Sequence, residues 1–591
     1  MAHTRTEPAS ATAAPSSAAS SAPSASSRRS ATAGDRLLLD TARHSAARAA
    51  ALCLLAVAST GAALLLPLAL GHTVDLLLAR RGPDAGRWVG LCALLVAGPA
   101  LLDAATELLT GTTAARATAR LRHRILGHVL AAGPRAAGRF PPGDLVTRAV
   151  GNAADTGTAP ATLAHAAASV VGPLGGIVAL GLIDPWLAVA FLAGAPLLAA
   201  LLRAFTRAST DCVARYQQLQ GDIAGRLVEA LGGARTIAAA GTTAREHARI
   251  LGPLPELSRQ GHRMWHVQGR STAQAGTLVP LLQIAVLAVA GLRLSQGLLS
   301  VGDLLAASRY AVLATGVGML VGHLNAAVRA RAAAGRVAEV LGVPQLPYGE
   351  QRLPAGPGTL ELRGVSVVRG GRTVLHDVTV TVPGGTSLAV VGRSGSGKSV
   401  LAEVAGRLAD PDTGTVLLDG APLPGLRRHD LRRAVGYAFA RPALLGGTVG
   451  GTIAFGAFTP GREACEDAAR AACAHDFLRR LPQGYDTPCT DAPLSGGETQ
   501  RLGLARAFAH AGRVLILDDA TSSLDTATER RVSAALHAPG PSSPTRVIVA
   551  HRPATAATAD HVLWIEEGRP KAVSRHADLW HDPQYRAVFH A

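Results

Sequence analysis

With 591 residues, the chain is too long for one ordinary domain, so at least two folded units are expected. Hydrophobic residues make up 48% of it but aromatic residues only 3%, which is typical of long apolar helices. The net charge is +17, and nearly all basic residues are arginines that cluster beside apolar stretches. This placement favours loops at a membrane surface, and not nucleic acid, as the reason for the charge. The six cysteines have no metal-ligand spacing and indicate a reducing environment.

The first part of the chain divides into a polar tail and an apolar region. Residues 1–34 are rich in Ser, Ala, Pro and Thr, and we expect them to be disordered because they cannot bury a core. Residues 35–342 contain six apolar stretches of the length that crosses a bilayer, which takes about 20 helical residues. They are Ala49–Gly71, Trp88–Leu102, His165–Ile183, Pro185–Leu202, Ser271–Leu292 and Leu304–Leu324. This number favours a six-helix membrane domain over the buried helices of a large soluble protein.

The arginines are unevenly distributed between the two sides of this domain. The links after the second and fourth stretches are rich in arginine, from Arg116 to Arg148 and from Arg203 to Arg270. The opposite side has few charges. By the positive-inside bias, we expect a multi-pass protein of a bacterial-type cell membrane with both termini in the cytoplasm. Both links continue as helix-compatible sequence, which predicts helices that extend beyond the bilayer.

A different pattern follows a linker at residues 343–357. Residues 358–591 alternate short β-branched runs with helical stretches, among them SLAVVG, VLILDD and RVIVAH. Strands that alternate with helices predict an α/β domain with a largely parallel sheet.

A glycine-rich loop in this second part carries the strongest chemical signal. The sequence GRSGSGKS follows a predicted strand and opens a predicted helix, which is the context of a phosphate-binding loop. Its residues are Gly392, Arg393, Ser394, Gly395, Ser396, Gly397, Lys398 and Ser399. Backbone N–H groups of such a loop surround phosphate oxygens, the lysine contacts the terminal phosphates, and the final hydroxyl reaches Mg²⁺. Asp518, at the end of the apolar run VLILD, is the expected second Mg²⁺ group.

A second motif that suits an anion lies nearly one hundred residues further on. In LSGGE, Ser495, Gly496 and Gly497 precede a predicted helix and would present N–H groups and a hydroxyl to a phosphate. One chain has no need of two such motifs, so we expect this one to contact a nucleotide held by another subunit.

The order GRSGSGKS, LSGGE, VLILDD, SSLD and VIVAHR resembles an ATP-binding-cassette (ABC) domain. Behind six predicted membrane helices, it resembles an exporter-type half-transporter of that superfamily, over roughly residues 36–591. The resemblance implies ATP and Mg²⁺ as ligands and ATP-driven transport as the function. It also implies that Ser495–Glu498 and Asp525 contact the nucleotide of a paired chain, and that His551 contacts the γ-phosphate and orients the attacking water.

Four positions depart from the family pattern. Ala440 stands where the family has a glutamine, Val368 or Arg369 where it has an adenine-stacking tyrosine, and Glu498 where it has the signature glutamine. Asp519 stands where the family has a glutamate that acts as general base. The aspartate is shorter by one methylene, which withdraws its carboxylate by about 1.3–1.5 Å and is costly for a base that must lie within hydrogen-bond reach.

This aspartate leads to a hypothesis about partners. We expect the chain to bind ATP at its own site but to hydrolyse it poorly, while its LSGGE completes an active site on a different half-transporter. A homodimer with a working Asp519 is the alternative.

The sequence says less about the cargo, for which a small molecule, a lipid and a peptide all stay open. Asp103 and Glu107 lie one turn apart, and Arg309 lies in the sixth stretch; charges at such depth often face a substrate path. An importer with the exporter fold is the second reading. A soluble cassette ATPase that acts on nucleic acid or ribosomes is a third, which the six apolar stretches oppose.

Overall fold

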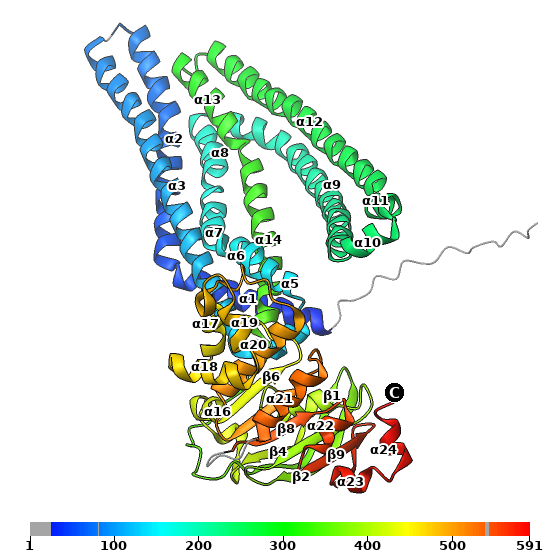
Figure 1. Cartoon of the computed structure of the whole chain (residues 1–591). Coiled ribbons are helices and arrows are strands. Elements are labelled where there is room, and N and C mark those ends of the chain that lie inside the picture. Colours follow the sequence, from blue (N-terminus) through cyan, green and yellow to red (C-terminus); the bar gives the residue numbers. More distant parts are fainter. Residues whose placement is uncertain (1–24, 81, 538–542, 591) are drawn as a thin grey trace, which may run out of the picture. The chain divides into compact units, whose positions relative to one another are not determined.

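The computed structural model describes residues 25–80, 82–537 and 543–590 (Figure 1). The chain divides into two compact units. One is helical and reaches from the N-terminal region to Val129 and from Phe140 to Gly342. The other combines residues 130–139 with the α/β region that begins at Val343.

Long helices dominate the first unit because its sequence offers few strand or turn signals. α3, α9 and α12 have 51, 48 and 42 residues, which corresponds to roughly 60–75 Å at 1.5 Å per residue. A bilayer core is about 30 Å thick, so these helices continue beyond it, as the arginine-rich links predict. α9 and α12 run along each other as far as the short helices α10 and α11 (Figure 1). The helices up to Gly342 are α1 (Ala25–His44), α2 (Ala46–Leu78), α3 (Gly82–Ala132), α4 (Pro134–Arg139, in the second unit), α5 (Pro142–Thr147), the π-helical turn η1 (Arg148–Asn152), α6 (Ala153–Gly157), α7 (Ala159–Ala168), α8 (Val171–Ile183), α9 (Pro185–Gly232), α10 (Ala234–Ala240), α11 (Thr243–Leu251), α12 (Leu254–Ser295), α13 (Val301–Ala314) and α14 (Val317–Leu341).

The membrane-spanning stretches differ in detail from the six that were predicted. Within the described residues, four helical stretches are long and apolar enough to cross a membrane: Ala46–Leu78, Pro83–Ala132, Pro142–Ile183 and Thr243–Ser295. A shorter apolar helix covers Pro185–Leu197. The predicted stretch Leu304–Leu324 is divided at Thr315 and Gly316, between α13 and α14. A helical membrane domain is therefore confirmed, and the number of six spans stays a prediction.

The start of α1 lies within the region that was predicted to be a disordered tail. α1 begins at Ala25, inside the region 1–34 for which disorder is expected, and residues 1–24 lie outside the described part. From Leu37 onwards the helix has an amphipathic sequence, and Leu37 and Thr41 are buried in the first unit.

α2 and α13 approach each other so closely that two glycines face across the contact. A Cβ built on Gly71 or Gly302 would collide with the backbone of the other residue. Next to this contact, the carboxylate of Asp75 accepts hydrogen bonds from the Ser300 hydroxyl at 2.6 Å and from the Gly302 backbone N–H at 2.8 Å. Close backbone packing and a carboxylate that accepts two hydrogen bonds thus join the end of α2 to the start of α13.

A partly buried ion pair joins the α8–α9 corner to α12. Asp184 begins α9 by accepting a hydrogen bond from the Trp186 N–H, and its other carboxylate oxygen lies 2.6 Å from Arg293 Nε. The Asp184 side chain is only 6% exposed, whereas that of Arg293 is 27% exposed. The charge of Arg293 is therefore only partly hydrated and depends on Asp184.

We expect Asp184→Asn to lower the free energy of unfolding by roughly 2–3 kcal/mol, because it leaves Arg293 without its counter-charge but keeps a helix-capping side chain. Thermal unfolding of the purified protein in detergent measures the effect. Adding Arg293→Gln to the Asp184→Asn protein should then lower the free energy of unfolding by little more. Strictly additive losses from the two substitutions would contradict the coupling.

Two sheets make up the second unit. Five strands of the larger sheet are parallel, in the order β9-β3-β8-β7-β6, and β10 joins β9 antiparallel. The smaller sheet, β2-β1-β4-β5, is antiparallel. The prediction of a largely parallel sheet therefore holds only for the larger one. β1 and β2 are antiparallel because the tight turn at Gly370–Gly371, where φ is positive at both residues, permits only a hairpin.

The strands of the second unit are β1 (Leu360–Arg369), β2 (Arg372–Val382), β3 (Ser387–Val391), β4 (Thr413–Leu418), β5 (Ala421–Pro422), β6 (Val435–Phe439), β7 (Val514–Asp518), β8 (Thr545–Val549), β9 (His561–Glu566) and β10 (Arg569–Ser574). Its helices after the membrane region are α15 (Lys398–Ala405), α16 (Arg428–Ala434), α17 (Val449–Ala454), α18 (Arg462–Ala471), α19 (His475–Arg479), α20 (Gly496–Ala509), α21 (Thr526–His537), α22 (Pro553–Ala557), α23 (His576–Leu579) and α24 (Pro583–Ala587).

The core of this unit explains where its site lies. α15 packs between the two sheets through apolar residues such as Leu401 and Val404, and α18, α20 and α21 cover the other face of the larger sheet. Because β3, β6, β7 and β8 are parallel, the loops after their carboxyl ends meet at one edge of that sheet. The phosphate loop, Asp518, Asp519 and His551 come from this edge, and the signature motif and Asp525 come from the starts of α20 and α21.

Candidate nucleotide-binding site

The loop between β3 and α15 has the backbone that a phosphate-binding loop needs. Gly395 and Gly397 have φ of +79° and +97°, in the left-handed region that favours glycine. A side chain at Gly397 would also lie 2.7 Å from Leu375 and 2.9 Å from the Val374 carbonyl oxygen. These glycines let the chain curve tightly before α15, so that backbone N–H groups and the helix N-terminus point to the same side.

Lys398 is buried beneath this loop. Its side-chain amino group donates hydrogen bonds to the carbonyl oxygens of Gly392 and Arg393, at 2.8 and 3.0 Å. Burial lowers the pKa of Lys398, and the nearby carboxylates of Asp519 and Asp518 partly offset this shift. The loop therefore holds a cation, and phosphate oxygens could take the place of the two carbonyl groups that now accept its hydrogen bonds.

Ser399 and Asp518 meet as the sequence predicts for a magnesium site. The Ser399 hydroxyl donates a hydrogen bond to Asp518 Oδ1 at 2.9 Å. Burial raises the pKa of Asp518, and the hydrogen bond from Ser399 lowers it again. A hydroxyl and a carboxylate beside a phosphate loop are oxygen ligands of the kind that Mg²⁺ prefers, so these residues fit the ion.

Asp519, the next residue, has an unusual backbone and a close partner. Its φ of +52° lies in the left-handed region, which is uncommon for residues other than glycine but which aspartate adopts more readily than most. Its Oδ1 atom lies 2.7 Å from His551 Nε2, in the loop that follows β8. The two residues with predicted catalytic roles are thus in direct contact with each other.

The signature motif begins α20 with a capping box. The Ser495 hydroxyl accepts from the Glu498 backbone N–H, and the Glu498 carboxylate accepts from the Ser495 N–H at 2.8 Å. The hydroxyl of Ser495 also lies 2.8 Å from the Glu498 carboxylate, and these hydrogen bonds lower the pKa of Glu498. Glu498 thus places a negative charge beside the motif that is expected to contact phosphate.

Asp525 has a comparable role at the start of α21. Its carboxylate accepts hydrogen bonds from the backbone N–H groups of Ala527 and Thr528. The side chain of Thr528 and then these backbone groups lower the pKa of Asp525. The residue is exposed, as a group that reaches another subunit must be.

Gln500 is a residue of this site that sequence reasoning missed. It lies on α20, is 1% exposed, and its amide nitrogen lies within hydrogen-bond distance of the carbonyl oxygens of Ala440 and Asp519, at 3.2 and 3.1 Å, and of Ser522 Oγ at 3.0 Å. Its carbonyl oxygen accepts from the Ser523 N–H at 2.8 Å. The sequence did contain a signal for this role. Gln500 lies about one turn into a predicted helix, next to positions that face the core, and a buried amide needs hydrogen-bond partners.

We expect Gln500→Leu to slow ATP hydrolysis and to lower the free energy of unfolding by about 1–3 kcal/mol, because it removes the partner of the partly buried hydrogen bonds to the Ser523 N–H and the Asp519 carbonyl. Gln500→Glu keeps the acceptor for Ser523 but loses both N–H donors. ATPase kinetics and thermal unfolding of both variants check this. Unchanged kcat in a folded Gln500→Leu protein would show that Gln500 does not position the loop after β7.

The other departures from the family pattern lie around the same edge. Ala440 follows β6 and offers only its carbonyl to Gln500. At the tip of the β1–β2 hairpin, Val368 is 43% exposed, and Arg369 lies 3.6 Å from Glu403 on α15. No tyrosine lies there to stack on a base; an apolar surface and a guanidinium stand in its place.

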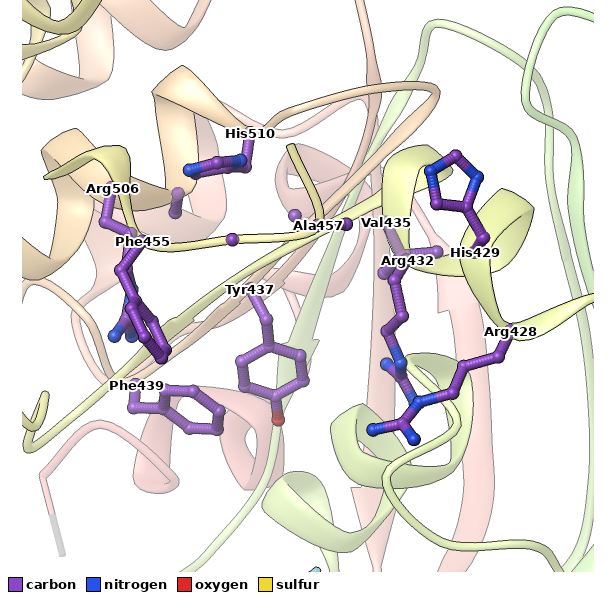
Figure 2. Close-up of a pocket in the computed structure, with 13 residues that line it drawn as sticks. Arg428, His429, Arg432, Val435, Tyr437, Phe439, Phe455, Ala457, Arg506 and His510 are labelled. Carbon is purple, nitrogen blue, oxygen red and sulfur yellow. The ribbon is translucent and has the colours of Figure 1, made fainter. Parts of the chain in front are cut away.

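A cavity of about 700 Å³ lies beside β6 and is separate from the phosphate loop (Figure 2). The rings of Tyr437 and Phe439 stack at 4.4 Å in its wall, Phe455 is exposed there, and Arg428 and Arg432 line another side. Phe439 directly precedes Ala440, so the end of β6 borders both this cavity and the hydrogen bonds of Gln500.

The three charged residues predicted for a substrate path are not brought together by hydrogen bonds. Asp103 accepts a hydrogen bond from the Ser59 hydroxyl of α2 at 2.7 Å. Glu107 and Arg309 are exposed on α3 and α13, and neither has an ion-pair partner in the described part of the chain. Their role in a substrate path stays a prediction.

Comparison with known proteins agrees with this architecture. Residues 50–316 match the family described as "ABC transporter transmembrane region", and residues 375–522 match the family described as "ABC transporter". The chain belongs to the ABC transporters, as a membrane domain fused to an ATPase domain, and couples ATP hydrolysis to transport.

Three relatives illustrate the similarity. The ABC transporter ATP-binding protein RamA of Streptomyces coelicolor is 56% identical over 542 residues, which cover 91% of this chain and 84% of that protein. An ATP-dependent lipid A-core flippase of Pseudomonas fluorescens is 33% identical over 68% of each chain. The solved structure of a bacterial Atm1-family ABC exporter with ATP bound has a TM-score of 0.78 at 25% identity, covering 93% of this chain and 98% of that one.

Proposed function

We propose that this chain is one half of a bacterial cell-membrane exporter, with its own ATP site weak and with a different half-transporter as its partner. The single observation that carries this proposal is the pair of Asp519 and His551 at 2.7 Å. The carboxylate that should accept a proton from water is short by one methylene and contacts the histidine that should orient that water.

In this proposal the residues around the phosphate loop bind MgATP. The loop Gly392–Gly397 would surround the phosphates with N–H groups, and Lys398 would exchange its carbonyl contacts for phosphate oxygens. Ser399 and Asp518 would hold Mg²⁺, which when bound neutralises charge on the phosphates. The phosphate loop with Lys398 and the pair of Ser399 and Asp518 do not require a glutamate at position 519. The site therefore still binds MgATP when its hydrolysis of ATP is impaired.

The signature motif supports the choice of a different partner chain. Ser495, Gly496 and Gly497 keep the form that contacts a phosphate, and Asp525 is exposed at the start of α21. Paired with a half-transporter that has glutamate at the position of Asp519, this motif would complete a fully active site on the partner. In a homodimer both sites would instead have the short carboxylate.

The proposed cargo is an amphipathic small molecule, lipid or peptide that leaves from the cytoplasmic side. The likeness to a protein named as a lipid A-core flippase and to an Atm1-family exporter supports export of such a cargo. The arginine-rich links support an orientation in which both termini and the ATPase domain are cytoplasmic.

The test compares the chain alone with the chain co-purified with a second half-transporter that carries the glutamate, both in nanodiscs. We expect both samples to bind ATP and only the pair to hydrolyse it briskly. In inverted membrane vesicles, the pair should take up a fluorescent amphipathic reporter in an ATP-dependent manner. Brisk hydrolysis by the chain alone would overturn the heterodimer, and ATP-driven movement in the opposite direction would support the importer alternative.

A further inference from the structure

A small basic cavity lies at the base of the membrane unit, between α1 and α3. Its volume is about 160 Å³, and its wall comes from α1, the start of α2 and the middle of α3. Four arginines, Arg48, Arg116, Arg120 and Arg124, line it together with one aspartate, Asp40.

Among the residues that the structure describes, most of this positive charge has no counter-charge. Asp40 lies 2.8 Å from Arg124 Nη1 and 3.3 Å from His44 Nδ1. Within the described residues, Arg48, Arg116 and Arg120 have no ion-pair partner. Arginines that converge on a small cavity lined by a single acid carry excess positive charge and attract an anion.

Two polar atoms in this wall are buried and lack a hydrogen bond. The Thr113 side chain belongs to a residue that is 1% exposed, and its Oγ1 has no partner; the same is true of the buried Nη1 atom of Arg48. Elsewhere on the same helix, Thr106 Oγ1 bonds to the Leu102 carbonyl at 2.7 Å, which is the usual arrangement for a helical threonine. Buried polar groups are nearly always satisfied, so the free hydroxyl and guanidinium indicate a missing ligand.

The cavity lies where the apolar part of the helices ends. Leu52 of α2 packs against Ala161 and Ala164 of α7, with Leu109 of α3 beside them. Arg48 lies one turn before Leu52, and Thr113 lies one turn after Leu109, so both reach the cavity just beyond this apolar cluster. In the membrane orientation of the proposed function, the lipid headgroups would lie at this level.

We propose that this cavity binds the phosphate group of an anionic phospholipid. Its volume is well below the roughly 300–1,000 Å³ of sites for drug-sized ligands, so it suits a compact anion and not a nucleotide or the transported cargo. Arg116 and Arg120 would contact the phosphate oxygens, Thr113 would donate its hydroxyl, and Arg48 its free Nη1. The acyl chains would extend along the exposed apolar residues of α2, such as Leu54.

The test measures lipid binding to the full-length protein in neutral detergent by native mass spectrometry. The probes are phosphatidylglycerol, phosphatidylcholine and inorganic phosphate. We expect saturable binding of phosphatidylglycerol, stronger than that of phosphatidylcholine and weakened by inorganic phosphate. Arg116→Gln with Arg120→Gln should weaken it about fivefold for each arginine removed. Thr113→Val, which changes no charge, should weaken it about threefold to tenfold.

A matched pair separates this site from general charge. Arg245→Gln with Arg263→Gln removes the same charge from exposed arginines of α11 and α12 and should leave binding unchanged. Equal loss in this control, or normal binding by Thr113→Val, would overturn the site. Saturable binding of inorganic phosphate without any preference for phosphatidylglycerol would show that the cavity binds free phosphate and not the phosphate group of a lipid.

Discussion

Lys398→Met is expected to lower ATP turnover at this chain's own site by about 10²–10³-fold, measured on the chain alone in the Asp519→Glu background, in which that site is expected to hydrolyse ATP. Lys398 is buried, and its amino group lies within hydrogen-bond distance of two carbonyl oxygens of the phosphate loop. No other lysine or arginine takes part in these contacts, so the variant removes the cation that would meet the terminal phosphates. Loss of one such preorganised group typically costs that factor.

The chain contains a natural control for this substitution. Lys571, the only other lysine, is paired with Glu566 on the surface of the β9–β10 hairpin. Lys571→Met makes the same chemical change away from the site and should leave turnover close to normal. ATP binding by filter assay and hydrolysis by phosphate release distinguish the two variants. Equal activity of Lys398→Met and the parent would contradict the role of the loop.

Asp519→Glu is expected to raise the ATPase rate of the chain alone by about 10²-fold. The added methylene returns the carboxylate by about 1.3–1.5 Å toward a water beside the γ-phosphate, and a displacement of 1 Å can change a rate by that factor. It also changes the contact with His551, which lies 2.7 Å from the shorter side chain. Phosphate release by the purified chain in nanodiscs measures the gain.

Asp519→Asn is the matched variant, since it keeps the length and removes the charge. If the chain alone is nearly inactive, this variant should change its rate little while ATP still binds. If the parent hydrolyses ATP briskly and Asp519→Asn abolishes it, Asp519 is a working base and the homodimer is correct. His551→Ala should lower the rate of the Asp519→Glu protein, because the histidine would still orient the water.

Much of this architecture could be predicted from residue patterns. The loop Gly392–Ser399 and the strand that ends at Asp518 are local signals, and their contact at 2.9 Å joins two parallel strands of one sheet, β3 and β7, that are separated only by β8. Other features depend on tertiary packing. The hairpin of β1 and β2 forms a separate antiparallel sheet, and the α13–α14 break divides an apolar stretch that reads as one helix. Gln500 lies two residues after the LSGGE motif, but its four partners lie in two other loops, one after β6 and one between β7 and α21.

The contact between Gly71 and Gly302 has a consequence for the transport cycle. Two helices whose backbones touch, with the carboxylate of Asp75 bound to both Ser300 and Gly302, have little freedom to slide or part at that end. α2 and α13 should therefore keep their relative position there while the opposite ends change. Rearrangement of the membrane unit would then be a hinge rotation, with the contact between these two glycines as the fixed point.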